Sequence, residues 1–323
     1  MRHQKKRWFA ALLSLCMLLS ILPSTSIAFS ESEETWSGNR RKQTIDGGTH
    51  TITLSNLTID SPGVEKSAID ITGNADVTFI LEGNNTLRGY RNHPAIWVES
   101  GSSVTFEGNG LLEASAGGAS IGLGAAGIGG GYGASSNFGN ITINGGTIIA
   151  RGSGGGAGIG GGYEVGSGTV TGNVTINGGY VTAIGGSSGS TGGAGIGSGE
   201  NANYSGTVTI NGGVVYAEGG ADSTSIGRGN RAIGTSDNGA FTTGTGGNAV
   251  IVAPDGIGDP SGFADWDGIF ISYEGNNTSA TVGEDGTVHL NDTEANIQVW
   301  GEPVIDYPLV VESGTELRVV QND

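Results

Sequence analysis

Cysteine is nearly absent from this chain of 323 residues, which has only Cys16. No disulfide can therefore link two parts of the chain, and the fold must depend on burial and hydrogen bonds. Proline is also scarce, and none lies between Ala95 and Ala253. Glycine is abundant, with 64 residues, but it shows no three-residue period, so a collagen-like triple helix is excluded.

Basic residues are few, with 14 Lys and Arg against 31 Asp and Glu. Four of the basic residues and none of the acidic ones lie in segment 1–28, so the rest of the chain has 10 against 31, a net charge of −21. A surface with this charge repels nucleic acid and anionic lipid. We expect neither as a partner, although an acidic surface is also usual for solubility alone.

Segment 1–28 has the order of features that is typical of a secretory signal peptide. Basic residues within 2–7 precede an apolar run at 8–22, and Ser26-Ile27-Ala28 supplies a small-residue cleavage site. The apolar run is too short for a membrane span, so we expect no membrane insertion. The sequence therefore predicts a secreted or cell-surface protein that begins near Phe29 and has no cysteine.

Glycine clusters alternate with short β-branched runs at a long and regular spacing. The repeated unit is Ala-Gly-Ile-Gly, a polar loop, [Ile/Val]-Thr-Ile-Asn-Gly-Gly and a final run that ends in alanine. The Asn-Gly-Gly turns begin at Asn144, Asn177 and Asn211, which gives spacings of 33 and 34 residues. A period of this length is typical of proteins that stack one structural repeat on the next.

The apolar segments are too short for helices and have the alternating, β-branched pattern of strands. If successive repeats pair in parallel, about 4.8 Å apart, alternate residues form columns that point into the core or out to solvent. The predicted inward column is Phe79, Phe106, Ile143, Ile176 and Ile210, and the predicted outward column is Thr78, Thr105, Thr142, Thr175 and Thr209. We therefore predict an all-β fold in which residues 29–242 form a right-handed parallel β-helix, a solenoid whose coils each hold three short strands.

The chain changes character at residue 243, after which glycine thins out and acidic residues accumulate. Residues 243–323 hold 14 Asp and Glu and a single basic residue, Arg318. Their apolar segments predict strands at Gly268–Tyr273, Val282–Leu290 and Pro308–Val320. This β-rich region is either a polar cap that blocks pairing at the end of the solenoid or a small separate domain.

Several motifs of the chain resemble those of a known family. They are Ser67–Ile71, Ala75–Leu81, the Ala-Gly-Ile-Gly-Gly-Gly segments at Ala126 and Ala157, the three Thr-Ile-Asn-Gly-Gly turns, and Val311–Leu317. Together they resemble glycine-rich, secreted or cell-surface parallel β-helix proteins of Gram-positive bacteria, of the carbohydrate-binding-domain type. The resemblance covers most of the chain after segment 1–28 and implies a surface protein that faces carbohydrate.

Three tyrosines are the candidate binding residues. Tyr132 and Tyr163 occupy the same position after their Ala-Gly-Ile-Gly-Gly-Gly segments, and Tyr204 lies in the next equivalent loop. Aromatic rings that recur on an exposed wall suit the apolar faces of sugar rings, so we predict that all three bind carbohydrate. The alternative is that the rings pack against neighbouring repeats. For the asparagines of the three turns, we expect a ladder of side-chain hydrogen bonds rather than a binding role.

Catalysis is a second alternative, because polysaccharide lyases and glycoside hydrolases also use β-helices and gather carboxylates on one face. Between residues 115 and 230 no two acidic residues occupy matching positions of neighbouring repeats; they are Glu164, Glu200, Glu218 and Asp222. The histidines His50, His93 and His289 lack the spacing of metal ligands. We therefore predict no catalytic residue, no metal and no cofactor. The expected protein binds a polysaccharide or cell-surface glycan, or serves as a surface element, and its oligomeric state stays open.

Overall fold

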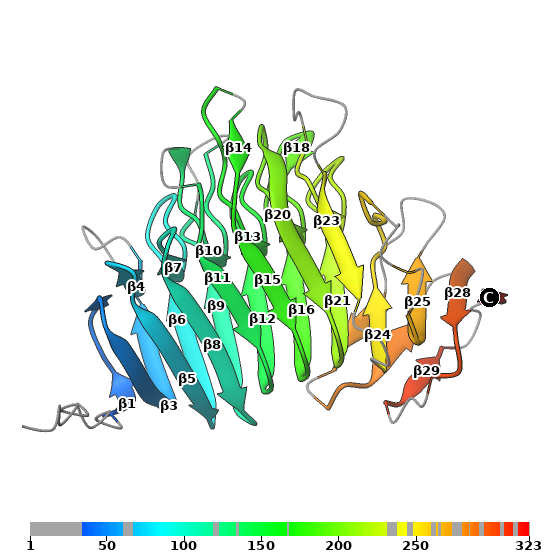
Figure 1. The fold of residues 1–323 in the computed structure, drawn as a ribbon, viewed down its shortest axis with the longest axis horizontal. Coiled ribbons are helices and arrows are strands. Elements are labelled where there is room, and N and C mark those ends of the chain that lie inside the picture. Colours follow the sequence, from blue (N-terminus) through cyan, green and yellow to red (C-terminus); the bar gives the residue numbers. More distant parts are fainter. Residues whose placement is uncertain are drawn as a thin grey trace, which may run out of the picture. The chain divides into compact units, whose positions relative to one another are not determined.

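The computed structural model describes residues 34–322 apart from short internal gaps, and the predicted signal peptide at 1–28 lies outside the described residues. The gaps are 61–66, 119–122, 134–135, 167, 231–237, 244–247, 260–262, 264–265, 273–279, 284, 291–293, 304–306 and 313–315. The described residues form strands and turns, with no α-helix among them. The chain is therefore all-β, and its two long sheets are largely parallel (Figure 1).

The strands follow one another closely along the chain. Those before residue 116 are β1 (Glu34–Asn39), β2 (Gln43–Asp46), β3 (Thr49–Asp60), β4 (Ile69–Thr72), β5 (Asp76–Glu82), β6 (Asn84–Arg88), β7 (Ile96–Val98), β8 (Ser103–Gly108) and β9 (Leu111–Ser115). The glycine-rich part holds β10 (Ile128–Gly129), β11 (Asn140–Ile143), β12 (Thr147–Arg151), β13 (Ile159–Gly160), β14 (Thr169–Val170), β15 (Asn173–Ile176), β16 (Tyr180–Ile184), β17 (Ser187–Ser188), β18 (Thr191–Gly192), β19 (Ile196–Gly197), β20 (Asn203–Ile210), β21 (Val214–Glu218), β22 (Ile226–Gly227), β23 (Asn238–Thr243) and β24 (Ala249–Val252).

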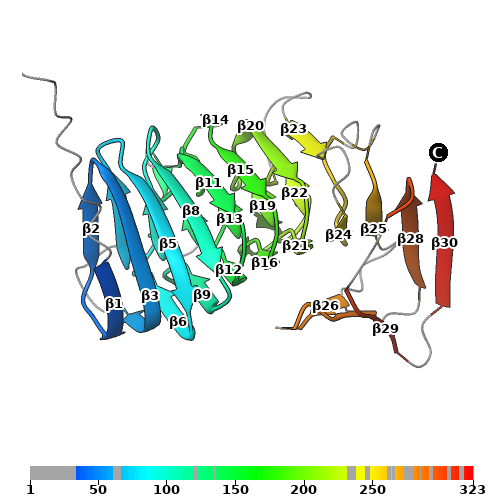
Figure 2. The same ribbon diagram turned by 60° about the horizontal axis from the view of Figure 1, so that its bottom comes forward.

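Neighbouring strands of each long sheet come from successive repeats of the sequence. The smaller sheet, in the order β2-β4-β7-β10-β13-β19-β22, is parallel throughout. Its residue pairs, such as Ile128 with Ile159 and Ile159 with Ile196, join the same position of consecutive repeats. In the larger sheet β11 pairs with β15 and β12 pairs with β16 in the same way (Figures 1 and 2). The repeats therefore stack in register, as the sequence predicts.

The predicted inward column lies in the core of the larger sheet. In register from one repeat to the next it runs through Phe79, Phe106, Ile143, Ile176 and Ile210, and each side chain is 0% exposed. The predicted outward threonines pair in the same register and are half-buried; they are Thr78, Thr105, Thr142, Thr175 and Thr209. A shift of the pairing by one residue would turn the apolar column outward, so its burial selects this register. Both columns are confirmed.

Glycine is required in the smaller sheet because the backbone of one repeat lies against that of the next. Gly129, Gly160 and Gly197 each follow a buried isoleucine, and their φ angles are positive, at 126°, 133° and 137°. A Cβ on Gly160 would lie 1.9 Å from the carbonyl oxygen of Gly197, far inside a van der Waals contact. Only glycine fits this combination of backbone conformation and close approach.

A second set of glycines lets the loops of successive repeats lie directly on one another. A Cβ on Gly156 would lie 2.0 Å from the carbonyl oxygen of Ala125, and one on Gly162 would lie 2.0 Å from that of Gly131. Backbone groups are also satisfied between repeats, for example by the hydrogen bond from Gly186 N to the Gly156 carbonyl oxygen (2.8 Å). Glycine therefore serves close backbone packing here and not the flexibility of a linker.

The asparagines of the Asn-Gly-Gly turns form the predicted ladder on the outside of the larger sheet. Asn177 donates to Asn144 (2.8 Å) and Asn211 donates to Asn177 (2.7 Å), in each case from Nδ2 to Oδ1. Asn144 donates in turn to the carboxylate of Glu107 (3.1 Å). The ladder thus joins the turns of four successive repeats along the outer surface.

The C-terminal residues continue the larger sheet. β25 (Gly268–Ser272) pairs in parallel with β24, β28 (Glu294–Trp300) pairs antiparallel with β25, and β30 (Glu316–Asn322) pairs in parallel with β28. The predicted strand Gly268–Tyr273 corresponds to β25, whereas β28 is absent from the strand predictions.

Two strand predictions for the C-terminal region need correction. The segment Val282–Leu290 is divided between β26 (Ala280–Val282) and β27 (Val288–Leu290), because the chain turns at Gly286, whose φ is 76°. The segment Pro308–Val320 is divided in the same way between β29 (Leu309–Val311) and β30.

The strands β26, β27 and β29 form a small sheet that covers part of the outward face of the larger one. The two surfaces share an apolar cluster made of Val214, Tyr216, Val250, Val252, Ile271, Val288, Leu290 and Ile297. The residues that alternate with these, such as Val215 and Ile251, belong to the main core instead. Strands β21 and β24 are therefore apolar on both faces, as strands are when both faces are covered. Residues Glu33–Asp323 form one compact unit.

Candidate functional site

Two of the three predicted binding residues lie side by side. Tyr132 follows β10 and Tyr163 follows β13, at equal distances from the paired residues Ile128 and Ile159. Their rings stack with centroids 5.6 Å apart and an angle of 22° between the planes. Both side chains are half-buried. The equal offset in the sequence therefore places the two rings one repeat apart on the same side of the stack.

The position of Tyr163 is fixed from three sides. Its backbone N donates to the carbonyl oxygen of Gly124 (2.9 Å), and its own carbonyl oxygen accepts from Gly133 N (2.9 Å). The phenol oxygen accepts a hydrogen bond from Nδ2 of Asn201 (2.8 Å). A Cβ on Gly155 would lie 3.0 Å from Cδ2 of the ring, so the ring rests on bare backbone at that point. Backbone hydrogen bonds, a side-chain hydrogen bond and the close approach of Gly155 thus all define the position of Tyr163.

Polar and apolar groups surround the tyrosine pair. The Ser136 hydroxyl donates to the carboxylate of Glu164, and Glu164 N donates to the carbonyl oxygen of Glu200 (3.0 Å). The side chain of Glu200 is 3% exposed and lies close to Gly155, where an added Cβ would meet its Oε2 at 2.6 Å. Val165, by contrast, is 58% exposed. The surface around the rings therefore offers an apolar contact, an amide and a carboxylate.

The stacking limits how much of each tyrosine ring is accessible. Each ring covers one face of the other, and the ring of Tyr163 also rests on Gly155. The pair is therefore not a row of two coplanar platforms. The exposed remainder of the rings lies beside two hydrogen-bonding side chains, Asn201 and Glu164.

The third predicted residue, Tyr204, lies in the core, and its prediction as part of an exposed wall is wrong. Its side chain is 0% exposed, and its ring stacks on Phe138 with centroids 6.3 Å apart. Its hydroxyl donates to the carbonyl oxygen of Gly172 (2.9 Å), and burial raises the pKa of the phenol. The residue equivalent to Tyr132 and Tyr163 in the third repeat is Glu200, because it directly follows the segment 194–199.

Two carboxylates that the sequence does not align come together at the end of β21. Asp255 Oδ2 accepts from Gly219 N (2.9 Å), and Glu218 accepts from the Tyr216 hydroxyl (2.6 Å). Burial raises the pKa of Asp255; the hydrogen bond from Gly219 opposes this, and the charge of Glu218 adds to it. Ser225 Oγ also donates to Asp255 (3.4 Å). The bonds of Asp255 join the end of β21 to the segments before β22 and after β24, whereas the bond of Glu218 stays within β21.

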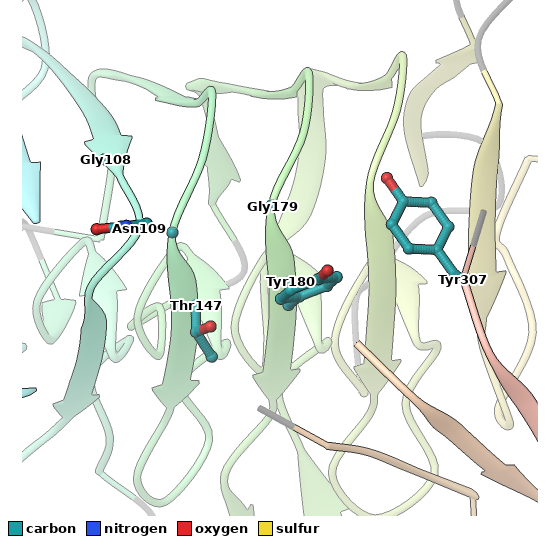
Figure 3. A pocket seen from close by; sticks show the side chains of 7 residues that line it. Gly108, Asn109, Thr147, Gly179, Tyr180 and Tyr307 are labelled. Carbon is teal, nitrogen blue, oxygen red and sulfur yellow. The ribbon is translucent and has the colours of Figure 1, made fainter. Parts of the chain in front are cut away.

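A pocket of about 240 Å³ lies on the outward face of the larger sheet. It is lined by Gly108, Asn109, Gly146, Thr147, Gly179, Tyr180 and Tyr307 (Figure 3). The rings of Tyr180 and Tyr307 meet edge to face, with centroids 6.0 Å apart and an angle of 83°. The sequence gives no sign of this pair, because Tyr307 comes from the C-terminal region and no repeat relates it to Tyr180. Neither a carboxylate nor a histidine is among the lining residues.

Metal ligands do not gather anywhere in the part of the chain that the structure describes: no group of three or more His, Cys, Asp or Glu residues is placed to hold an ion. Across the same residues, no helix has the length and apolar character needed to cross a membrane. In comparisons with known proteins, no family model, no curated protein and no solved structure matches this chain.

Proposed function

We propose that the chain is an exported, non-catalytic protein that binds a neutral polysaccharide, with Tyr132 and Tyr163 in contact with the sugar. The observation that carries this proposal is the stacked tyrosine pair, which two successive repeats present in register. Partly exposed rings beside the amide of Asn201 and the carboxylate of Glu164 offer the two kinds of contact that sugars use. These are apolar contact with the ring face and hydrogen bonds to hydroxyl groups.

The scaffold that we infer is a right-handed parallel β-helix with a β-rich C-terminal region. In-register pairing of residues 31 and 37 positions apart, such as Ile128 with Ile159 and Ile159 with Ile196, supports this architecture. The right-handed sense follows from the general rule for crossover connections between parallel strands. A stack of similar repeats presents similar groups at a regular interval, which suits a ligand that is itself a repetitive chain.

A neutral glycan fits the charge of the protein better than an acidic one. After removal of segment 1–28 the chain has 10 basic residues against 31 acidic ones. Glu164 and Glu200 lie beside the tyrosine pair itself. A polyanionic polysaccharide would be repelled both over the long range and at the contact.

Export through segment 1–28 is part of the proposal. The secreted protein should begin near Phe29 or Glu31, which mass spectrometry of the culture medium measures directly. Recovery of the chain in the membrane fraction with Met1 in place would contradict export by cleavage.

The test of binding uses the mature chain on a glycan array, with a reducing-sugar assay alongside. Tyr132→Ala combined with Tyr163→Ala should weaken the binding of any neutral glycan that is found by about tenfold or more, since each aromatic contact contributes about 1 kcal/mol. The matched control is Tyr90→Ala, which removes another half-buried tyrosine, one that lies beneath the guanidinium of Arg91 (5.4 Å).

Thermal stability separates a lost contact from a damaged fold. The double variant should keep the fold and melt only a few degrees below the unsubstituted chain, because the half-buried rings lie outside the main core and lose only their stacking and the bond from Asn201. Unchanged affinity in the double variant would mean that Tyr132 and Tyr163 only pack against neighbouring repeats and do not bind the glycan. Release of reducing sugar by the mature chain would show instead that it is a polysaccharide-active enzyme.

A further inference from the structure

The pocket near Tyr180 has a floor of bare backbone. Gly108, Gly146 and Gly179 lie at successive turns of the larger sheet, and their φ angles are 92°, 82° and 82°. A Cβ on Gly179 would lie 2.6 Å from the carbonyl oxygen of Gly146, so the turns pack too tightly for a side chain. These turns therefore carry no side chain at the three positions, two of which, Gly108 and Gly179, are labelled in Figure 3.

The aromatic wall of the pocket is built from two distant parts of the chain. Tyr180 opens strand β16, and Tyr307 precedes β29 in the C-terminal region. The turn between β26 and β27 also lies against the ring of Tyr180. A Cβ on Gly286 would lie 2.0 Å from Cε1 of that ring, so the glycine backbone packs close to it. The segment of Tyr307 is held by the hydrogen bond from Val288 N to the carbonyl oxygen of Pro308 (2.9 Å). Both rings are therefore positioned in advance.

The remaining lining groups are polar but uncharged. Asn109 contributes an amide, Thr147 a hydroxyl, and the two tyrosines their phenols, and no ionisable acid or base other than these phenols lines the pocket. A charged ligand would lose its hydration here without gaining a counter-charge. The chemistry fits a ligand that has hydroxyl groups on its rim and an apolar face.

The size of the pocket restricts the ligand further. Its volume, about 240 Å³, is below the roughly 300–1,000 Å³ of pockets that enclose drug-sized ligands. A single sugar ring is a ligand of the right chemistry for so small a space. A chain of several rings would have to continue out of the pocket along the surface.

We infer that this pocket is a subsite for one neutral sugar ring, which packs against Tyr180 and Tyr307 and forms hydrogen bonds with Asn109 and Thr147. The inference rests on the proposed function and extends it. It gives the C-terminal region a part in binding, because Tyr307 and the turn at Gly286 complete the wall. It also separates two contact areas, one at the Tyr132 and Tyr163 pair and one at this pocket.

Fluorine NMR of the mature chain labelled with 3-fluorotyrosine distinguishes the two areas. The chain has 8 tyrosines, and each resonance is assigned by a Tyr→Phe variant. The probes are glucose, galactose, mannose and N-acetylglucosamine, with the β-1,4-linked hexasaccharides of glucose and N-acetylglucosamine. We expect saturable shifts of the Tyr180 and Tyr307 resonances, with no shift of the buried Tyr204 resonance.

The outcomes bear separately on the pocket and on the proposed function. Shifts confined to Tyr132 and Tyr163 would overturn the pocket and leave the proposed function in place. Shifts confined to Tyr180 and Tyr307 would support the pocket and remove the tyrosine pair from the proposal. No shift of any of these four with any probe would overturn both.

A blocking variant gives a second test. Thr147→Trp should fill the pocket and reduce the affinity measured at Tyr307 at least tenfold. The matched control is Thr78→Trp, which places the same ring on the outward face of β5, away from the pocket lining, and should leave that affinity unchanged. Equal loss in both variants would show that the effect comes from the fold. Unchanged affinity in both would overturn the pocket.

Discussion

The N-terminal repeats, before residue 116, and the glycine-rich central repeats that follow pair in the same register. They differ in the residues that occupy equivalent positions. At one position of the smaller sheet the N-terminal strands carry Asp70 and Trp97, whereas the next strands carry Gly129 and Gly160. Asp70 is buried and forms an ion pair with Lys42, so the N-terminal part packs side chain against side chain. The central part packs backbone against backbone at the same place.

This difference shows that the inward column and the glycines have separate roles. The column of Phe106, Ile143 and Ile176 runs without interruption from the N-terminal into the central repeats. It therefore sets the register in both regions. The glycines decide how closely the loops lie on the sheet, which is why the loops that carry Tyr132 and Tyr163 are held by backbone contacts.

The largest expected effect is a test of backbone packing in the central repeats. Gly160→Ala combines a φ of 133° with a Cβ only 1.9 Å from the carbonyl oxygen of Gly197. Strain and overpacking together should lower the free energy of unfolding by about 3–5 kcal/mol. Urea unfolding of the mature chain measures this loss.

The matched control separates backbone strain from the steric contact. Gly189 also has a positive φ, 66°, but an added Cβ there would meet nothing within 4 Å. Gly189→Ala should therefore cost only the strain of a left-handed conformation, about 1–2 kcal/mol. Equal losses at Gly160 and Gly189 would mean that close packing between repeats is not what requires glycine.

The second prediction concerns the column that both regions share. Ile176→Ala should lower the free energy of unfolding by about 2–5 kcal/mol, because the cavity would lie between Ile143 and Ile210 with little room to collapse. Thr175→Ala, on the outward side of the same strand, should cost about 0.5 kcal/mol. A larger loss at Thr175 than at Ile176 would reverse the assignment of the two faces.

The sequence is sufficient to predict the repeats, because each one carries both signals that matter. The 33- and 34-residue spacing of Asn144, Asn177 and Asn211 aligns the repeats, and the alternation around Ile143 and Ile176 identifies the buried face. Neither signal depends on residues outside the repeat. The ladder and both columns could therefore be predicted before the structure was known.

The prediction for Tyr204 was wrong because it followed the order of loops and not the position within the repeat. Counting from Ala194 as from Ala126 and Ala157 gives Glu200 as the equivalent of the exposed tyrosines. Tyr204 falls on β20, where it lies over Phe138. A strict alignment of offsets would have identified the error.

The sequence does indicate that both faces of strands β21 and β24 are buried. Val214-Val215-Tyr216 and Ala249–Val252 are apolar at consecutive positions, which indicates burial on both faces, whereas β15 alternates between polar and apolar residues. What covers these strands could not be predicted, since the small sheet lies outside the repeats. The contact between Tyr180 and Tyr307 depends on that arrangement.

The third prediction tests whether the outer ladder contributes as much as the column inside it. Asn177 bonds to both Asn144 and Asn211, whereas Asn211 is bonded to Asn177 alone along the described ladder. Asn177→Ala should lower the free energy of unfolding by about 1 kcal/mol, and Asn211→Ala by about half as much, because water replaces part of each exposed bond. Thermal unfolding at matched protein concentration measures both. A loss at Asn177 as large as that at Ile176 would show that the ladder, and not the core, holds the repeats together.

The smallest expected effect is at Asp255, where the acidic C-terminal region contacts the end of β21. The pKa of Asp255 is raised by burial and by the charge of Glu218, so the folded chain binds this proton more tightly than the unfolded chain does. The stability that Asp255 contributes is therefore full below the ordinary pKa of a carboxyl group and is lost as the pH rises through the raised pKa.

Asp255→Asn stays uncharged at every pH and keeps an oxygen that accepts from Gly219 N. It should match the unsubstituted chain at acidic pH and exceed it slightly at neutral pH. The gain should be below about 0.5 kcal/mol, because Asp255 is only partly buried, and solvent at its exposed part screens the charge. Melting curves recorded from acidic to neutral pH measure this gain. A double-mutant cycle with Glu218→Gln should reduce the gain, because the charge of Glu218 is one of its causes. A gain that is largest at acidic pH would contradict this prediction. It would mean that the hydrogen bonds to the Asp255 carboxylate stabilise the folded chain by more than burial and the charge of Glu218 destabilise it.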